Sequence, residues 1–149
     1  IAPALDALAT RRVHVGRVGA GHVAKLVNNL LCATHLLAAA EAMRLCEASG
    51  LDVATVVAGI NAGSGRSAAT EVNLPRWVLN GAYDSGFTMK LMRKDVALAR
   101  RLVADLGLSL PLAEQAALAW AQSAATLGDG EDFNRIAAHP LAAERAHAG

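Results

Sequence analysis

Lys25, Asn28 and Asn29 are the residues of this 149-residue sequence whose types and spacing could do chemistry. Asn28 and Asn29 follow Lys25 by three and four residues, so on a helix the three side chains occupy neighbouring faces. Lysine is unfavourable near a helix N-terminus, and adjacent asparagines are poor helix formers. A lysine with an asparagine one turn later could hold a hydroxyl or carbonyl group. On these local features alone, the commoner arrangement is a lysine that reaches solvent and asparagines that cap or bridge helices.

Two glycine-rich segments could contact a ligand through their backbone. Gly16-x-x-Gly19-x-Gly21 superficially resembles a phosphate-binding turn, but a dinucleotide site has the order G-x-G-x-x-G and a second strand after its helix. Glycines at a hinge between two elements explain this pattern better. Gly63-Ser64-Gly65-Arg66-Ser67 could bind an anion at the start of the next helix. It could equally be a plain connection with Ser67 as N-cap.

A predicted helix carries a run of basic side chains, which usually indicates a solvated face: Lys90, Arg93, Lys94, Arg100 and Arg101. The pair Lys94-Asp95 is the exception, because apolar residues flank it. No group of cysteines and histidines has metal-ligand spacing, so we expect no metal site.

The elements that must position these residues are helices. The longest is expected over His22–Ser49 and ends before Gly50; it is apolar around nearly its whole circumference, which is typical of a helix buried in a bundle or between subunits. Asp52 is expected to cap the next helix, and Pro75 to end or kink the third in its first half. The remaining helices are predicted over residues 53–62, 68–79, 87–106, 111–127 and 132–139. Before them, a short helix over Pro3–Ala9 and a strand over Arg12–Gly16 suggest the last αβ unit of a sheet domain whose other strands are missing.

The composition supports a helical globular domain and excludes several classes of function. Hydrophobic residues make up 54% and charged residues 18%, enough for a core, while aromatics are 3% and the net charge is +1. Few aromatics and interspersed charges argue against a nucleic-acid partner. Cys32 and Cys46 lie roughly 21 Å apart on one helix, so we expect reduced thiols, as in the cytoplasm. Leu30–Ala40 is too short to cross a bilayer, and no signal peptide is visible.

The run from His14 to Asn29 resembles the domain junction of the β-hydroxyacid dehydrogenases, the family of 3-hydroxyisobutyrate dehydrogenase and tartronate semialdehyde reductase. Gly19, Gly21, Lys25 and Asn29 all match the family pattern. Residues 61–67 resemble the family's loop beside the substrate pocket, and residues 87–96 resemble its Phe…Lys-Asp helix. The resemblance covers about residues 1–139.

The resemblance implies an all-α domain of the 6-phosphogluconate dehydrogenase C-terminal type, built on one long central helix. Residues 1–16 would be a remnant of an N-terminal Rossmann domain, 17–140 the substrate and dimerisation domain, and 141–149 a flexible tail. Lys25 would be the general acid/base, and Asn29 would orient the substrate. The implied substrate contacts are Gly19, Gly21, Asn28, Gly63, Ser64 and Gly65. Lys94 and Phe87 would contact NAD or NADP, which the missing N-terminal domain would bind for the most part.

The resemblance therefore predicts an NAD(P)-dependent oxidoreductase that interconverts a small 3-hydroxyacid and its semialdehyde. Burial and a nearby cation favour the neutral form of a lysine, and Lys94 could be that cation. We expect a homo-oligomer through the helical domain, and no turnover by this chain alone. Two alternatives stay open: an imine reductase-like relative, which Lys25 argues against, and a non-catalytic helical dimerisation module.

Overall fold

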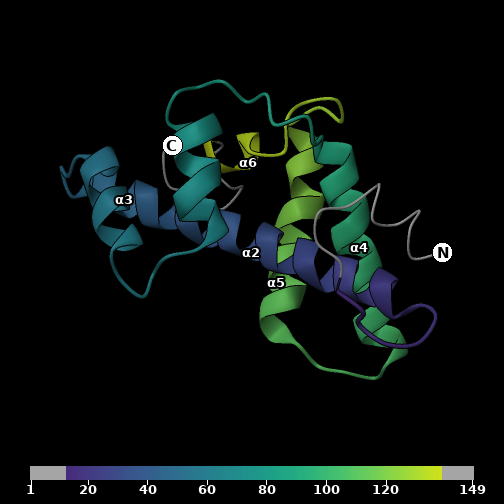
Figure 1. Ribbon diagram of the computed structural model, residues 1–149. Helices are drawn as coiled ribbons and strands as arrows, with labels where there is room; N and C mark the ends of the chain where they lie inside the picture. The colour runs from purple at the N-terminus through teal and green to yellow at the C-terminus, as the bar shows by residue number, and fades with distance from the viewer. Residues whose placement is uncertain (1–12, 139–149) are drawn as a thin grey trace, which may run out of the picture.

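A single long helix, α2 (Ala20–Ala48), runs through the middle of the fold, and the other helices lie around it (Figure 1). The computed structural model describes residues 13–138. Within that range the chain is helical and has no strand, which confirms the all-α prediction. The remaining elements are α3 (Val53–Asn61), η1 (Ala69–Val78), α4 (Met89–Asp105), α5 (Pro111–Gln122), η2 (Ser123–Ala125) and α6 (Arg135–Ala138).

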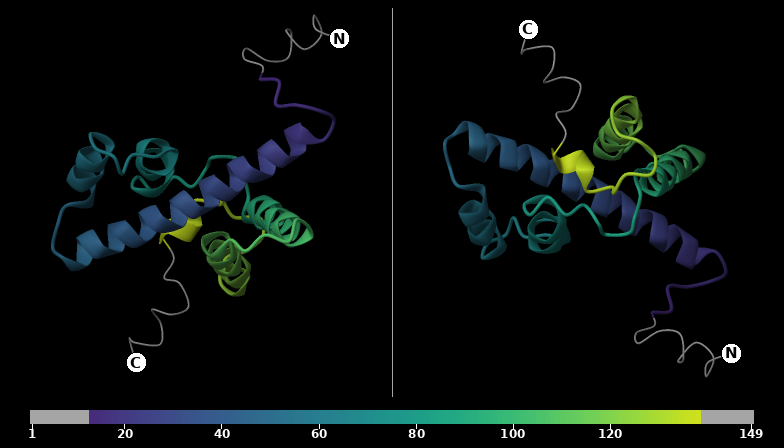
Figure 2. Two further views of the ribbon diagram at one scale, coloured as in Figure 1. Left: turned by 90° about the horizontal axis from the view of Figure 1, so that it is seen from below. Right: turned by 90° about the horizontal axis from the view of Figure 1, so that it is seen from above.

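The helices form two groups on either side of α2. Figure 2 shows α3 and η1 beside the C-terminal half of α2, whereas α4 and α5 cross it on the other side. By length and composition alone α2 could cross a membrane, because an 18-residue window has a mean hydropathy of 1.3, so the apolar segment is longer than Leu30–Ala40. A core helix meets the same criteria, and α2 contacts α3, η1, α4, α5 and α6 within the fold.

Capping and glycine residues set the ends of the helices much as predicted. The Asp52 carboxylate accepts a hydrogen bond of 2.9 Å from the Thr55 backbone N–H at the start of α3. Gly50 ends α2 and Gly107 ends α4, with φ angles of 73° and 65° that a glycine adopts at little cost. Two predicted helices were too long. α5 ends at Gln122 and continues as the short 3₁₀ turn η2, and α6 begins at Arg135 rather than at residue 132.

The prediction that Pro75 ends or kinks the third helix in its first half is wrong. The helix η1 continues through Pro75 to Val78 in π geometry, in which each N–H bonds the carbonyl five residues earlier. Leu79 N–H, for example, bonds the Leu74 carbonyl at 2.8 Å. Pro75 has no N–H, so it cannot bond the Thr70 carbonyl; the Asn61 side-chain amide donates to that carbonyl at 3.0 Å instead.

The core joins α2 to the last described helices. Trp120 is fully buried and donates its indole N–H to the Ala33 carbonyl of α2 at 3.2 Å. Phe133, just before α6, and Ile136, within it, are buried in the same core cluster as residues of α2. The buried Asn134 accepts a hydrogen bond of 2.7 Å from Asn73 of η1. The last turn of the domain is therefore an integral part of its core.

The N-terminal segment differs from the predicted strand. Val13 to Val15 form no strand and are exposed, whereas Arg12 lies outside the described residues. The predicted helix over Pro3–Ala9 and the predicted tail 141–149 also lie outside them. The proposed boundaries between domains stay predictions.

Candidate functional site

The buried carboxylate of Asp95 is the centre of the candidate site. It lies on α4, its side chain is 3% exposed, and it faces the first half of α2. Lys25 Nζ lies 3.1 Å from Asp95 Oδ2, and Asn29 Nδ2 donates to the same oxygen at 2.7 Å. A buried carboxylate without partners would be costly, and these two contacts compensate for its burial. Asp95 therefore fixes Lys25 and Asn29, one helical turn apart, in one orientation.

Two ammonium groups flank this carboxylate and reach solvent. Lys94 Nζ lies 3.8 Å from Asp95 Oδ1, and its side chain is 57% exposed. The Lys25 side chain is 54% exposed. The expected burial of Lys25 is therefore wrong, and its direct charged neighbour is the Asp95 carboxylate rather than the Lys94 ammonium. Lys25 is therefore exposed to solvent and paired with a buried carboxylate at the same time.

Asn28 connects this cluster to a groove. Its side-chain amide donates to Asn29 Oδ1 at 3.1 Å, so Asn29 accepts from Asn28 and donates to Asp95. Asn28 also lines a groove of about 630 Å³ between α2 and the loop 63–67. Ser64 and Gly65 line the same groove from the opposite side. Residues predicted as substrate contacts from two distant segments therefore face one space.

No hydrogen bond or ion pair joins the remaining predicted site residues, Gly19, Gly21, Phe87 and Gly63, to this cluster in the described part of the chain. Gly19 is the N-cap of α2 with a φ of 93°, and Gly21 lies in the first turn with open space at its Cα. Phe87 packs edge-to-face against Phe133, with ring centroids 5.5 Å apart, about two turns before Asp95. Gly63 belongs to the loop 63–67 but does not line the groove.

Asp95 is the functional residue that the sequence reasoning missed. The Lys94-Asp95 pair stood out because of its apolar neighbours, but the prediction assigned a role to the lysine. The buried positions of α4 are Met89, Met92, Asp95, Val96 and Ala99. A carboxylate in this apolar register is the signal that could have identified Asp95, because such a group is buried only when it is paired.

The basic side chains of α4 lie in two different environments. Lys90, Lys94 and Arg101 are exposed, as a solvated face predicts. The Arg93 side chain is only 12% exposed, and its guanidinium donates to the Leu127 carbonyl at 2.7 Å. Arg93 therefore has a structural role between α4 and the turn after α5.

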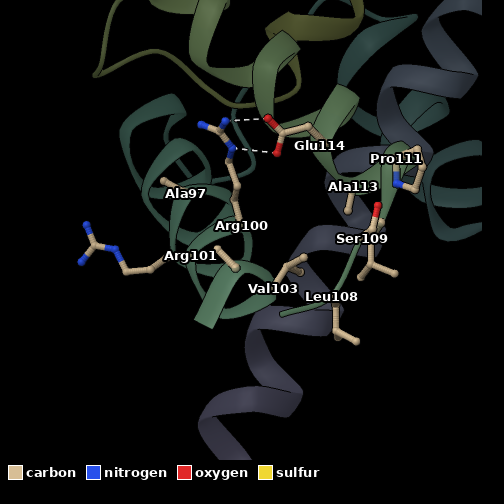
Figure 3. Close-up of a pocket in the computed structure, with 11 residues that line it drawn as sticks. Ala97, Arg100, Arg101, Val103, Leu108, Ser109, Pro111, Ala113 and Glu114 are labelled. Atoms are coloured by element: carbon tan, nitrogen blue, oxygen red, sulfur yellow. Dashed lines mark hydrogen bonds and ion pairs between the residues drawn. The ribbon is translucent and has the colours of Figure 1, made fainter. Parts of the chain in front are cut away.

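A second groove, of about 690 Å³, lies at the connection between α4 and α5 (Figure 3), and Asp95 does not line it. Arg100 and Glu114 face each other across it in a two-bond ion pair. The hydrogen bond from Arg100 holds the pKa of Glu114 below its ordinary value. Among residues 13–138, no group of three or more His, Cys, Asp or Glu could hold a metal ion.

Comparison with known proteins agrees with the resemblance seen in the sequence. Residues 19–139 match the family model described as NAD-binding of NADP-dependent 3-hydroxyisobutyrate dehydrogenase. A probable 3-hydroxyisobutyrate dehydrogenase of Mycobacterium tuberculosis is 35% identical over 140 residues, which are 90% of this chain and 47% of the relative. The 2-(hydroxymethyl)glutarate dehydrogenase of Eubacterium barkeri is 35% identical over 116 residues, 78% of this chain and 38% of the relative.

Solved structures give the same result. The M. tuberculosis 3-hydroxyisobutyrate dehydrogenase with L-serine superposes with a TM-score of 0.83 at 34% identity, covering 91% of this chain and 48% of that one. Psf3 in complex with NADP+ and 2-OPP superposes with a TM-score of 0.80 at 25% identity, covering 92% and 48%. The chain spans about half the length of these relatives. It belongs to the 3-hydroxyisobutyrate dehydrogenase family.

Proposed function

We propose that this chain is the helical part of an NAD(P)-dependent oxidoreductase that interconverts a small 3-hydroxyacid and its semialdehyde, with Lys25 as general acid/base. The observation that carries the proposal is the attachment of Lys25 and Asn29 to the buried carboxylate of Asp95. Membership of the 3-hydroxyisobutyrate dehydrogenase family supports the same reaction class.

The chain's own residues would move a proton and orient the substrate. In the direction of reduction, the Lys25 ammonium donates a proton to the carbonyl oxygen of the semialdehyde; in the direction of oxidation, the neutral amine takes the hydroxyl proton. Asp95 directs the Lys25 side chain, and Asn29 is held by Asp95 and Asn28 so that its position is fixed. NAD(P), when bound, supplies or accepts the hydride.

The described residues fit one wall of a cofactor site. Lys94 offers an exposed ammonium beside Lys25, available to a polar group that approaches from outside the chain. The Gly16–Gly21 turn has the wrong order for a pyrophosphate site. We therefore propose that an N-terminal domain holds most of the cofactor and that Lys94 and Phe87 lie near its nicotinamide end. The NADP+ bound to the relative Psf3 supports a nicotinamide dinucleotide as the cofactor.

We also propose that the enzyme is a homo-oligomer through this domain. Val23, Val27 and Leu31 are spaced one turn apart along α2 and are 42%, 49% and 52% exposed. A stripe of apolar side chains at this spacing is typical of a helix face that another surface covers.

The test is a substrate panel on the full-length enzyme with NAD and with NADP. We expect cofactor reduction with at least one of 3-hydroxyisobutyrate, L-serine and 2-(hydroxymethyl)glutarate, and none with the 149-residue chain alone. The substrates are those named for the relatives. Reduction of a cyclic imine without oxidation of any hydroxyacid would favour the imine reductase alternative. No turnover of either class would favour a non-catalytic module.

A further inference from the structure

The loop 63–67, which forms one wall of the groove beside Asn28, is closed by hydrogen bonds to a single buried residue. Thr70 is 5% exposed. Its hydroxyl accepts from the Ser67 backbone N–H at 2.9 Å and donates to the Ser67 carbonyl at 3.0 Å. Its backbone N–H donates to Ser67 Oγ at 3.4 Å. These three bonds fix the C-terminal end of the loop.

The N-terminal end of the loop is tied to the same residue through Asn61. The Asn61 amide donates to the Thr70 carbonyl at 3.0 Å. In the π pattern that carbonyl would accept from the N–H of residue 75, but residue 75 is a proline and has no N–H to give. The π geometry of η1 and the proline thus create an acceptor, and Asn61 uses it to bring the two ends of the loop together.

The body of the loop rests against the end of α3. A Cβ atom added to Gly65 would lie 3.2 Å from Cγ2 of Ile60, so the glycine permits a close approach that a side chain would push apart by a few tenths of an ångström. Ile60 and Gly65 both line the groove. The loop is therefore held by its two ends and by its middle.

We infer that Asn61 is a positioning residue, which fixes the loop 63–67 as the wall that receives the part of the hydroxyacid remote from the reacting carbon. The inference rests on the proposed function. Asn28 lines the groove and donates to Asn29 of the Lys25–Asn29–Asp95 cluster, so one end of the groove adjoins the cluster. A shift of the loop would change substrate binding while the proton donor stays in place.

Asn61→Ala in the full-length enzyme separates this role from a purely structural one. We expect KM for the hydroxyacid to rise about tenfold, a typical consequence of one lost hydrogen bond at a buried acceptor. We expect kcat and KM for the cofactor to change less than about threefold, because neither Lys25 nor Lys94 contacts the loop. Asn80→Ala is the matched control: Asn80 also donates to a backbone carbonyl, that of Arg76 at 2.8 Å, but does not line the groove.

A second substitution separates the loss of the loop contact from the loss of a partner for the buried carbonyl. Combining Asn61→Ala with Pro75→Ala introduces a backbone N–H at position 75 that can bond the Thr70 carbonyl, but it does not restore the link between residues 61 and 70. We expect the double variant to keep the raised hydroxyacid KM; recovery of KM would show that Asn61 serves only as a partner for that carbonyl. If Asn61→Ala does not fold, Gly65→Ala moves the same loop by another route and should raise the same KM with the Asn61 bond intact.

The outcomes distinguish this inference from the proposed function. An active wild-type enzyme whose hydroxyacid KM is unchanged in Asn61→Ala and Gly65→Ala would overturn the inference alone. A defect that falls mainly on kcat, or that Pro75→Ala relieves, would overturn it as well. A wild-type enzyme that turns over no hydroxyacid would overturn both.

Discussion

The two halves of α2 are both rich in apolar residues but lie in opposite environments. In residues 32–48 six positions are buried, among them Leu36 and Ala33 at 0% exposure, because α3, η1, α5 and α6 surround that half. In residues 20–31 only Leu26 is buried. The first half crosses α4, where it meets Asp95, and otherwise leaves apolar and polar side chains exposed.

This difference separates stability from chemistry along one helix. The second half contributes the buried apolar surface that stabilises the domain. The first half is extended from that rigid base, and it carries Lys25 and Asn29 on the side that faces Asp95. A site on a helix whose other end is locked in a core is held more precisely than a site on a loop.

The largest expected effect is on turnover, from a change in the first half. Lys25→Ala in the full-length enzyme should lower kcat by roughly 10² to 10⁴, the usual contribution of general acid–base catalysis. The melting temperature should fall as well, because the variant removes one of the two partners of the buried Asp95 carboxylate, although Asn29 remains bonded to it. Turnover is therefore compared at a temperature at which both proteins are folded. Lys90→Ala, on the exposed face of α4, is the control that removes the same group from outside the site. Turnover within a few-fold of wild type would reject Lys25 as the acid/base.

The next effect is on stability, from the second half. Leu36→Ala should destabilise the chain by about 2–5 kcal/mol, because Leu36 is fully buried. In the single subunit Leu31→Ala, on the same helix but 52% exposed, should stay within about 0.5 kcal/mol, whereas in the proposed oligomer it should cost more. Urea unfolding of both variants gives the comparison. A large effect of Leu31→Ala that depends on protein concentration would show that another subunit covers the first half.

A smaller effect should distinguish the two glycines at the start of α2. Gly19 has a φ of 93°, so Gly19→Ala should cost about 1–2 kcal/mol. Gly21 has open space and helical geometry, so Gly21→Ala should stabilise the helix by at most about 1 kcal/mol. Thermal melting measures both. If Gly21→Ala instead abolishes activity in a fully folded enzyme, a ligand approaches the backbone at Gly21, as the substrate-contact prediction requires.

The smallest expected effect is on the pH dependence of stability, through Asp132, which lies just before α6 on the side of the second half of α2. Burial alone would raise the Asp132 pKa, but hydrogen bonds from Ser85 and Asn134 outweigh it and lower the pKa below its ordinary value of 3.8. A lowered pKa contributes stability that is present above pH 3.8 and is lost as the pH falls through the folded value. Asp132→Asn should therefore lower the free energy of unfolding at about pH 6. Below pH 3.8 the free energy of unfolding should fall less in the variant than in the wild type. Equal acid sensitivity in wild type and variant would contradict this.

Local signals were enough to predict the helices and half of the site. The Asp52 cap, Gly50 and Gly107 depend on neighbours in sequence, and the helix ends that they predict agree closely with the structure. Lys25, Asn28 and Asn29 are likewise one turn apart on one helix. Their adjacency follows from helical geometry alone.

The missing parts all depend on contacts between distant segments. Asp95 joins Lys25 across 70 positions of sequence, and no local pattern on α2 indicates which α4 residue will face it. Pro75 predicts a break in an α-helix, but the Asn61 amide supplies the bond that the proline lacks, and the helix continues in π geometry. In both cases a contact between distant segments decides the outcome; at Pro75 this contact also overrides a local preference.

The packing of α6 on α2 has a consequence for how the protein is made. Phe133, Asn134 and Ile136 complete a core that begins in α2, and they are translated after the other described helices. On the ribosome, the core around the second half of α2 therefore stays incomplete until α6 has emerged. A nascent chain stalled before Phe133 should bind chaperones, and one extended past Ala138 should resist proteolysis.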